Sequence, residues 1–150
     1  VVIKQYVLER FEREYNLLIE LPGVSAIVAC VILSEIGPNV EAFKSQGNLA
    51  SWAGVCPGSY ESAGIKKSSH TTQGNKYLKS ILFQAGGTAG RSKDEAFHNL
   101  YARISGRSSK MKAIIACAHK MIRVIYKILS TGEHYDAKKA LGLRQQARAN

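Results

Sequence analysis

The spacing of the apolar residues constrains this chain most, because they recur at intervals of three and four along much of its length. The pattern is strongest over residues 110–129. Its apolar stripe consists of Met111, Ile114, Ile115, Ala118, Ile122, Ile125 and Leu129. A helix with about 3.6 residues per turn brings such positions to one face. The sequence therefore predicts an all-α fold.

The same spacing, interrupted by glycine and proline, predicts further helices over residues 1–20, 24–36, 46–53, 75–88 and 94–104. The first is amphipathic and is expected to be the end of a longer coiled coil. Three expected apolar faces are Val7, Phe11, Tyr15 and Leu18; Val24, Ile27, Val28, Val31, Ile32 and Ile36; and Tyr77, Leu78, Ile81, Leu82 and Ala85. We expect Trp52 to pack inward, and Gly86, Gly87 and Gly90 to weaken or end the helix over 75–88.

Length and composition limit the possible classes of protein. A chain of 150 residues is expected to form one compact domain with a substantial core. Neither an apolar run of about 18 residues nor a signal-peptide pattern occurs, so no membrane partner is expected. Cys30, Cys56 and Cys117 are far apart, which argues against disulfides or a zinc site and for a reducing, cytoplasmic setting. The chain starts without methionine, so we expect a fragment of a longer protein.

Positive charge is concentrated in the second part of the chain. Residues 1–59 carry four Lys/Arg and six Asp/Glu, whereas residues 60–150 carry 17 and five, which accounts for the net charge of +10. Between Ala96 and Gly132 the sequence has seven cations and no acid. Such a distribution indicates a polyanionic partner, because Lys and Arg contacts to phosphates supply non-specific affinity. A merely solvated basic face is the alternative.

The helix over 110–129 places part of this charge on one side. Lys112, Lys120, Arg123 and Lys127 fall within one quarter of its circumference, opposite the apolar stripe. No acidic residues lie one turn away to neutralise them. We therefore expect these four side chains to contact the phosphates of a nucleic acid. The alternative is that they are only solvated.

The polar segment 54–74 separates the two halves of the helical pattern. Ser62 stands there beside Gly64, and Lys66 and Lys67 follow. Glycine lets a backbone come close to a ligand and lysines tolerate phosphate charge, so the serine can approach a phosphodiester. A surface turn stabilised by the serine hydroxyl is the alternative.

Hydroxyl and amide side chains continue after the lysines and suit contact with a sugar-phosphate backbone. The expected nucleic-acid contacts of this region are Gly64, Lys66, Lys67, Thr71, Asn75 and Lys76. His70 has no evident carboxylate partner, which favours a phosphate or solvent contact over a role as base for Ser62. No Asp/Glu cluster with metal-ligand spacing occurs in the sequence, so this chain is expected to bind no metal.

The segment Leu21-Pro22-Gly23-Val24-Ser25-Ala26-Ile27 is typical of a helix-hairpin-helix turn, which aims helix N-terminal amides at a phosphate. Ser25 stands where a second glycine is usual. Gly23 and Ser25 are therefore candidate DNA contacts, and a purely structural helix junction is the equal alternative.

Several motifs occur in a fixed order over residues 18–135. They are Leu21-Pro22-Gly23-Val24, Glu35-Ile36-Gly37, Gly54-Val55-Cys56-Pro57-Gly58, Glu61-Ser62-Ala63-Gly64, Gly74-Asn75-Lys76-Tyr77-Leu78-Lys79 and Ala118-His119-Lys120-Met121-Ile122-Arg123. In combination they resemble the C-terminal transposase domain of insertion-sequence transposases with an N-terminal DEDD nuclease-like domain, the bridge-RNA-guided serine recombinases.

The resemblance implies that Ser62 is the nucleophile that attacks a DNA strand and forms a phosphoserine link. It implies activation by Mg²⁺ held in an acidic N-terminal domain, which this sequence does not contain, across an oligomer interface. DNA, a guide RNA and further copies of the chain are the implied partners. The fragment alone is expected to be inactive.

In this interpretation residues 1–20 are the end of a connector helix, 21–132 the catalytic-serine domain and 133–150 a polar, basic, frayed tail. The predicted activity is DNA strand cleavage and exchange during transposition. Two rival interpretations are a non-catalytic helical module that binds nucleic acid and a module for oligomerisation through the first helix.

Overall fold

The computed structural model describes residues 2–37, 40–55, 61–62, 65–66 and 75–141. The described elements are α1 (Val2–Leu18), α2 (Ala26–Ile36), the 3-10 helix η1 (Val40–Phe43), α3 (Gln46–Ala53), β1 (Glu61–Ser62), β2 (Ile65–Lys66), α4 (Lys76–Gly90), α5 (Glu95–Arg107) and α6 (Lys110–Thr131). The fold is all-helical, as predicted, apart from the two-residue strands. These pair antiparallel, Glu61 with Lys66 and Ser62 with Ile65.

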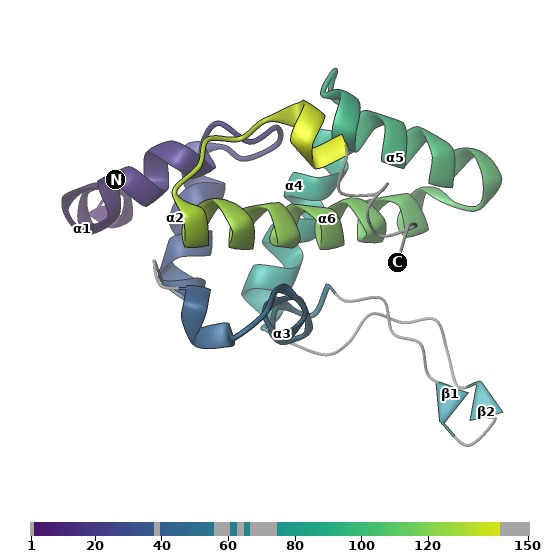
Figure 1. The fold of residues 1–150 in the computed structure, drawn as a ribbon, viewed down its shortest axis with the longest axis horizontal. Helices are drawn as coiled ribbons and strands as arrows, with labels where there is room; N and C mark the ends of the chain where they lie inside the picture. Colours follow the sequence, from purple (N-terminus) through teal and green to yellow (C-terminus); the bar gives the residue numbers. More distant parts are fainter. Residues whose placement is uncertain (1, 38–39, 56–60, 63–64, 67–74, 142–150) are drawn as a thin grey trace.

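Helix α6 lies at the centre of the molecule (Figure 1). It packs against α1, α3, α4 and α5, while α2 packs against α1 and α4. Its buried residues cover about half of its circumference and are Ala113, Cys117, Ala118, Met121, Ile122, Val124, Ile125 and Ile128. The predicted stripe was therefore too narrow, because neighbours approach α6 from several sides. Met111, placed in that stripe, is exposed near the start of the helix.

Helix α1 is amphipathic as predicted, with Val7, Tyr15 and Leu18 buried and Phe11 packed against the core. It is kinked at Phe11, where the backbone leaves helical values with φ −132° and ψ 38°. Its first turns extend beyond the body, and large apolar side chains there are exposed. The predicted helix over 1–20 is thus exposed over residues 2–6 and packed against the core from Val7 onward.

Helix α4 continues through Gly86 and Gly87, contrary to the prediction that they would weaken or end it, and it ends at Gly90, in line with that prediction. A Cβ on Gly86 would lie 2.7 Å from the backbone nitrogen of Ala118, and one on Gly90 would lie 2.5 Å from the Tyr101 ring. The glycines therefore let α4 approach α6 and α5 closely. The packing so gained offsets the usual helix cost of about 1 kcal/mol per glycine.

Three further burial predictions were wrong. Ile27 and Tyr77, assigned to apolar faces, are each 75% exposed, and Trp52, expected inside, is 39% exposed. Trp52 instead places its ring against Phe43, with a centroid separation of 5.2 Å. Among the described residues, all three side chains lie away from the buried faces of their helices.

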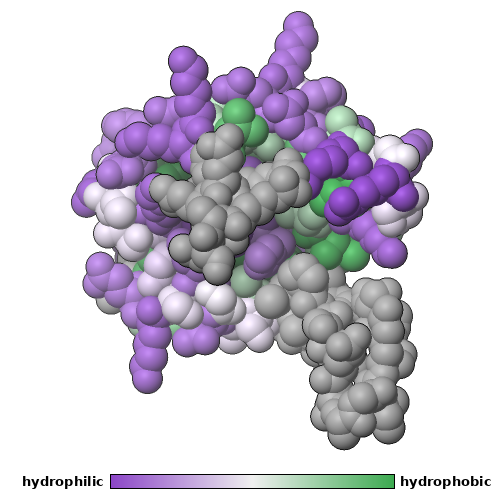
Figure 2. Space-filling view, turned by 45° about the vertical axis from the view of Figure 1, so that its right-hand side comes forward, coloured by the Kyte–Doolittle hydropathy of each residue, from purple (hydrophilic) through white to green (hydrophobic). Residues whose placement is uncertain are grey.

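The chain after α6 is held against the body at Tyr135, Ala140 and Leu141, so the predicted tail is not frayed there. Tyr135 donates a hydrogen bond of 2.8 Å from its hydroxyl to Asp94 Oδ2, and Ala140 is buried. Residues 142–150 lie outside the described part. Hydrophilic side chains cover most of the face seen in Figure 2, and hydrophobic atoms show only in small areas.

Candidate functional site

The segment that carries Ser62 connects α3 to α4, and both of its ends are fixed by hydrogen bonds. We call residues 56–74 the serine loop. Helix α3 ends at Gly54, which adopts the left-handed conformation (φ 77°, ψ 20°). The next residue, Val55, is buried and donates from its backbone N–H to the Ala50 carbonyl at 3.1 Å. The direction in which the chain leaves the helical body is thereby set.

Asn75 fixes the other end. Its side-chain oxygen caps α4 by accepting from the backbone N–H groups of Tyr77 and Leu78, at 3.1 and 3.0 Å. Its side-chain nitrogen donates to Glu35 Oε2 of α2 at 2.7 Å, and its backbone N–H donates to the Trp52 carbonyl of α3 at 3.0 Å. Asn75 therefore joins three helices at the base of the serine loop, a role that the sequence prediction of a nucleic-acid contact missed.

Within the serine loop the structure describes only the strand backbones. Ser62 ends β1 and pairs with Ile65, and Lys66 ends β2. Figure 1 shows the strand pair apart from the helices. The side chains of Ser62 and Lys66 lie outside the described part, as do the whole residues Gly64, Lys67, His70 and Thr71. Their predicted roles stay predictions.

The hairpin before α2 has a structural explanation. Gly23 has φ +79°, and a Cβ there would collide with the carbonyl oxygen of Ala85 in α4. Ser25 accepts a hydrogen bond of 3.3 Å from the Val28 N–H and so caps α2. These contacts give Gly23 and Ser25 structural roles that need no bound phosphate. Ser25 is nevertheless exposed. The predicted DNA contact stays a prediction.

The first turn of α4, beside the serine loop, carries exposed Lys76 and Tyr77. The turn contains no acidic residue. Sequence reasoning missed the exposure of Tyr77, yet the spacing contained a signal. Leu78, Leu82, Ala85 and Ala89 define the buried face at intervals of three and four, and Tyr77 lies about 100° away from Leu78.

The predicted basic face of α6 is only partly open. Lys112 is exposed, whereas Lys120, Arg123 and Lys127 are half-buried. Arg123 donates from Nε to Gln46 Oε1 at 3.1 Å, and Lys120 Nζ lies 6.0 Å from the Phe97 ring centroid. Two of the four cations thus help to hold α6 against α3 and α5.

Two groups on α6 have shifted pKa values. Burial, and then the charge of Arg123, lower the pKa of His119 below its usual value of 6.5. Burial raises the pKa of the Cys117 thiol to about 11, against a smaller opposing effect of Lys120. At neutral pH His119 is therefore uncharged and Cys117 is a thiol, as suits the buried position of Cys117 in the core.

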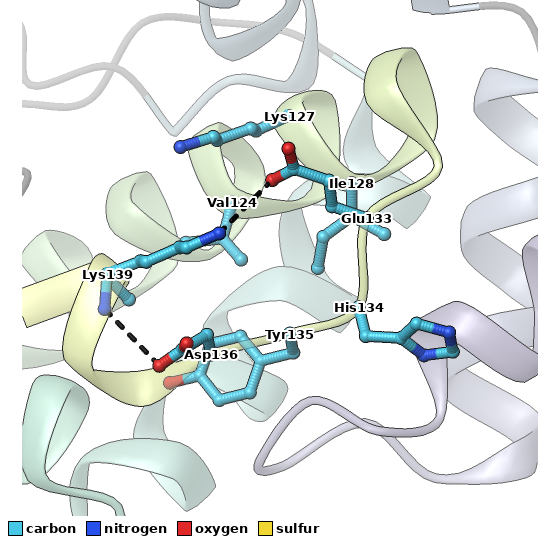
Figure 3. A pocket seen from close by; sticks show the side chains of 9 residues that line it. Val124, Lys127, Ile128, Glu133, His134, Tyr135, Asp136 and Lys139 are labelled. Atoms are coloured by element: carbon cyan, nitrogen blue, oxygen red, sulfur yellow. Dashed lines mark hydrogen bonds and ion pairs between the residues drawn. The ribbon is translucent and has the colours of Figure 1, made fainter.

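A small pocket of about 30 Å³, open to solvent, lies where the segment 133–140 crosses α6 (Figure 3). Lys127 and Lys139 line it together with Glu133 and Asp136. Lys139 Nζ lies 3.9 Å from Glu133 Oε2. Because the two cations are accompanied by two carboxylates, the described lining does not favour an anion.

Among the residues that the structure describes, no group of three or more His, Cys, Asp or Glu side chains is arranged to hold a metal ion. Over the same residues, no helix has the length and apolar character needed to cross a membrane.

Comparison with known families matches residues 15–102 to the model of the transposase IS116/IS110/IS902 family. The chain belongs to this family. The matched region extends from the second half of α1 through most of α5 and includes the serine loop. Helix α6 lies beyond it.

The chain is also similar to curated proteins. A Sinorhizobium fredii protein named as a transposase, y4pF/y4sB, is 32% identical over 126 residues, which cover 79% of this chain and 32% of that protein. The pilin gene-inverting proteins of Moraxella bovis and Moraxella lacunata are each 29% identical over 127 residues, 82% of this chain and 39% of theirs. The chain thus spans about a third of the length of these relatives.

Proposed function

We propose that this chain is the serine-bearing domain of a DNA transposase and that Ser62 is its nucleophile. Family membership supports transposition as the general activity. The observation that carries the finer proposal is the anchoring of the serine loop at Gly54 and Asn75. Such a base would hold a reacting group in a defined position relative to bound DNA.

The proposed step is a transesterification. The Ser62 Oγ attacks a DNA phosphorus, an Oγ–P bond forms, and the bond from phosphorus to one deoxyribose oxygen breaks. The serine proton goes to a base outside this chain, and the departing deoxyribose oxygen takes up a proton. Rejoining is the reverse attack by a hydroxyl of another strand, which releases the serine.

An unactivated serine hydroxyl is a weak nucleophile, so the step needs an activating partner. We propose that Mg²⁺ held by an acidic domain elsewhere in the full-length protein polarises the phosphate. Guide RNA is the proposed source of target choice. The proposed assembly is a homo-oligomer in which the serine and the acidic domain come from different copies.

Helix α1 offers a surface for such an assembly. Val2, Ile3 and Tyr6 are 80%, 62% and 52% exposed, although they lie on a helix whose other face is packed. Exposed apolar residues clustered on one short helical stretch favour association with a partner helix. We propose a second copy of α1 as that partner.

The proposal for Ser62 is tested by trapping the covalent intermediate. Full-length protein with guide RNA and target DNA is quenched in denaturant and separated by electrophoresis. The native protein should give a protein–DNA adduct, and Ser62→Ala should give none while binding DNA with unchanged affinity. Ser59→Ala, in the same loop, is the matched control. An adduct formed by Ser62→Ala would refute the proposed nucleophile.

A further inference from the structure

Two exposed aromatic side chains flank the two ends of the serine loop. Trp52, the chain's single tryptophan, precedes it in α3, and Tyr77 follows it in α4. The hydrogen bond from the Asn75 N–H to the Trp52 carbonyl brings the two chain segments together. We propose that Trp52 and Tyr77 form a stacking site for unpaired nucleobases beside the serine loop. This inference rests on the proposed function and adds the form of nucleic acid that is bound there.

The exposure of these rings is not explained by the fold. Trp52 is 39% exposed and Tyr77 75% exposed, so both leave apolar surface in water. Aromatic rings contribute strongly to stability only when they are buried. Trp52 is also held in place, because Phe43 packs at a centroid distance of 5.2 Å with an interplanar angle of 51°. A ring held before binding loses little conformational entropy when a base stacks on it.

The surrounding charge favours nucleic acid over a protein partner. The sequence contains no Asp or Glu between Ser62 and Lys93, and α4 begins with Lys76 and carries Lys79 one turn later. Cations in the first turn of a helix oppose the helix dipole, and a bound phosphate would remove that conflict. Glu35 is nearby, but its carboxylate accepts from Asn75 and is half-buried.

The stacking surface selects for unpaired bases. Both faces of a base within a duplex are covered by its neighbours, whereas an unpaired base has a free face. Aromatic side chains that accept a base, beside lysines that accept its phosphate, are the usual features of single-strand binding.

Binding at the proposed site can be measured by tryptophan fluorescence. Because Trp52 is the only tryptophan in the 150 residues, its fluorescence reports directly on the site. We expect single-stranded 12-mers to quench it and blunt duplexes of the same sequence not to. DNA and RNA 12-mers are titrated separately. Quenching by one alone identifies the strand bound, and quenching by both shows that the site accepts either. No quenching by either would overturn the proposal, as would equal quenching by duplex.

Tyr77 is tested by substitution. Tyr77→Ala should raise the Kd for the quenching 12-mer about tenfold, which corresponds to one lost stacked base. Tyr77→Phe keeps the ring and should bind as the native chain does. Ile27→Ala removes an apolar side chain that is 75% exposed on α2, as exposed as Tyr77, and is the matched control. An unchanged Kd for Tyr77→Ala, with an unchanged thermal unfolding midpoint, would exclude Tyr77 from the site.

Different results would refute the Ser62 nucleophile and the stacking site. If Ser62→Ala abolishes the covalent adduct while Tyr77→Ala binds normally, the stacking site is wrong and the nucleophile stands. If Tyr77→Ala weakens binding but Ser62→Ala still forms the adduct, the nucleophile is wrong and the stacking site stands.

Discussion

At the scale of single residues, the most informative side chain is Asn75. Three of its groups hold the base of the serine loop. The side-chain nitrogen bonds to α2, the backbone N–H to α3 and the side-chain oxygen to α4. The backbone carbonyl accepts from Lys79 N–H at 2.9 Å and begins α4. A residue expected to touch phosphate thus acts as a junction between helices.

The Asn75–Glu35 hydrogen bond can be tested by exchanging donor and acceptor. Asn75→Asp keeps the helix cap but sets a carboxylate against Glu35, so we expect a loss of about 1–3 kcal/mol in unfolding free energy. Adding Glu35→Gln supplies a donor to the carboxylate introduced at position 75 and should recover most of that loss. Denaturant unfolding measures both variants. Strand exchange by the full-length protein should likewise be impaired in Asn75→Asp and largely recovered in the double variant.

Glu35→Gln alone is the control, because its side-chain oxygen can still accept from Asn75. It should cost much less than Asn75→Asp. If the double variant is as unstable as Asn75→Asp, the hydrogen bond does not fix the loop base in the way described.

At the scale of elements, helix bounds follow from local chemistry, whereas helix burial does not. Helix α3 has the bounds that the sequence predicted, and serine, asparagine and aspartate side chains cap the starts of α2 to α6. The course of α4 through its glycines could not be predicted from local propensity. It depends on how closely α5 and α6 approach.

Helix α1 is the element whose exposed face predicts assembly. Ile3→Glu with Tyr6→Glu places charges on the proposed contact, so we expect dissociation to a smaller species. Sedimentation velocity over a concentration series measures the change. Ile27→Glu alters a 75% exposed isoleucine on α2 and should leave the mass unchanged. An unaltered mass for the α1 variant would show that this helix does not mediate association.

At the scale of the whole molecule, charge is distributed unevenly along the long axis. Helix α1 lies at one end and the turn between α5 and α6 at the other (Figure 1). Exposed Arg107, Lys110 and Lys112 surround that turn, and within the described residues no ion pair involves any of them. The ion pairs described involve residues 9–20 and the segment 133–139. The α5–α6 end is therefore the strongest candidate for long-range attraction of a polyanion.

Salt dependence tests this assignment. A plot of the logarithm of the binding constant against the logarithm of salt concentration has a negative slope. If Lys112 contacts a phosphate, Lys112→Ala should make this slope less steep by about one. Lys4→Ala removes an exposed cation from α1, where three cations and three acidic residues balance, and serves as the control. Affinity for a DNA duplex is measured at several salt concentrations. Equal slopes for both variants and the native chain would mean that the Lys112 side chain is only solvated.

The sequence by itself determined the all-α class, the order of the helices and the position of the polar segment that carries Ser62. These follow from apolar spacing and from turn and capping residues, which act over a few neighbouring positions. Tertiary structure decided that Ile27 and Tyr77 are exposed, that Arg123 is bonded to Gln46 and that Asn75 joins three helices. A periodic pattern defines a face of a helix but not its partner. Burial and hydrogen bonding between distant residues therefore depend on the packing of the whole chain.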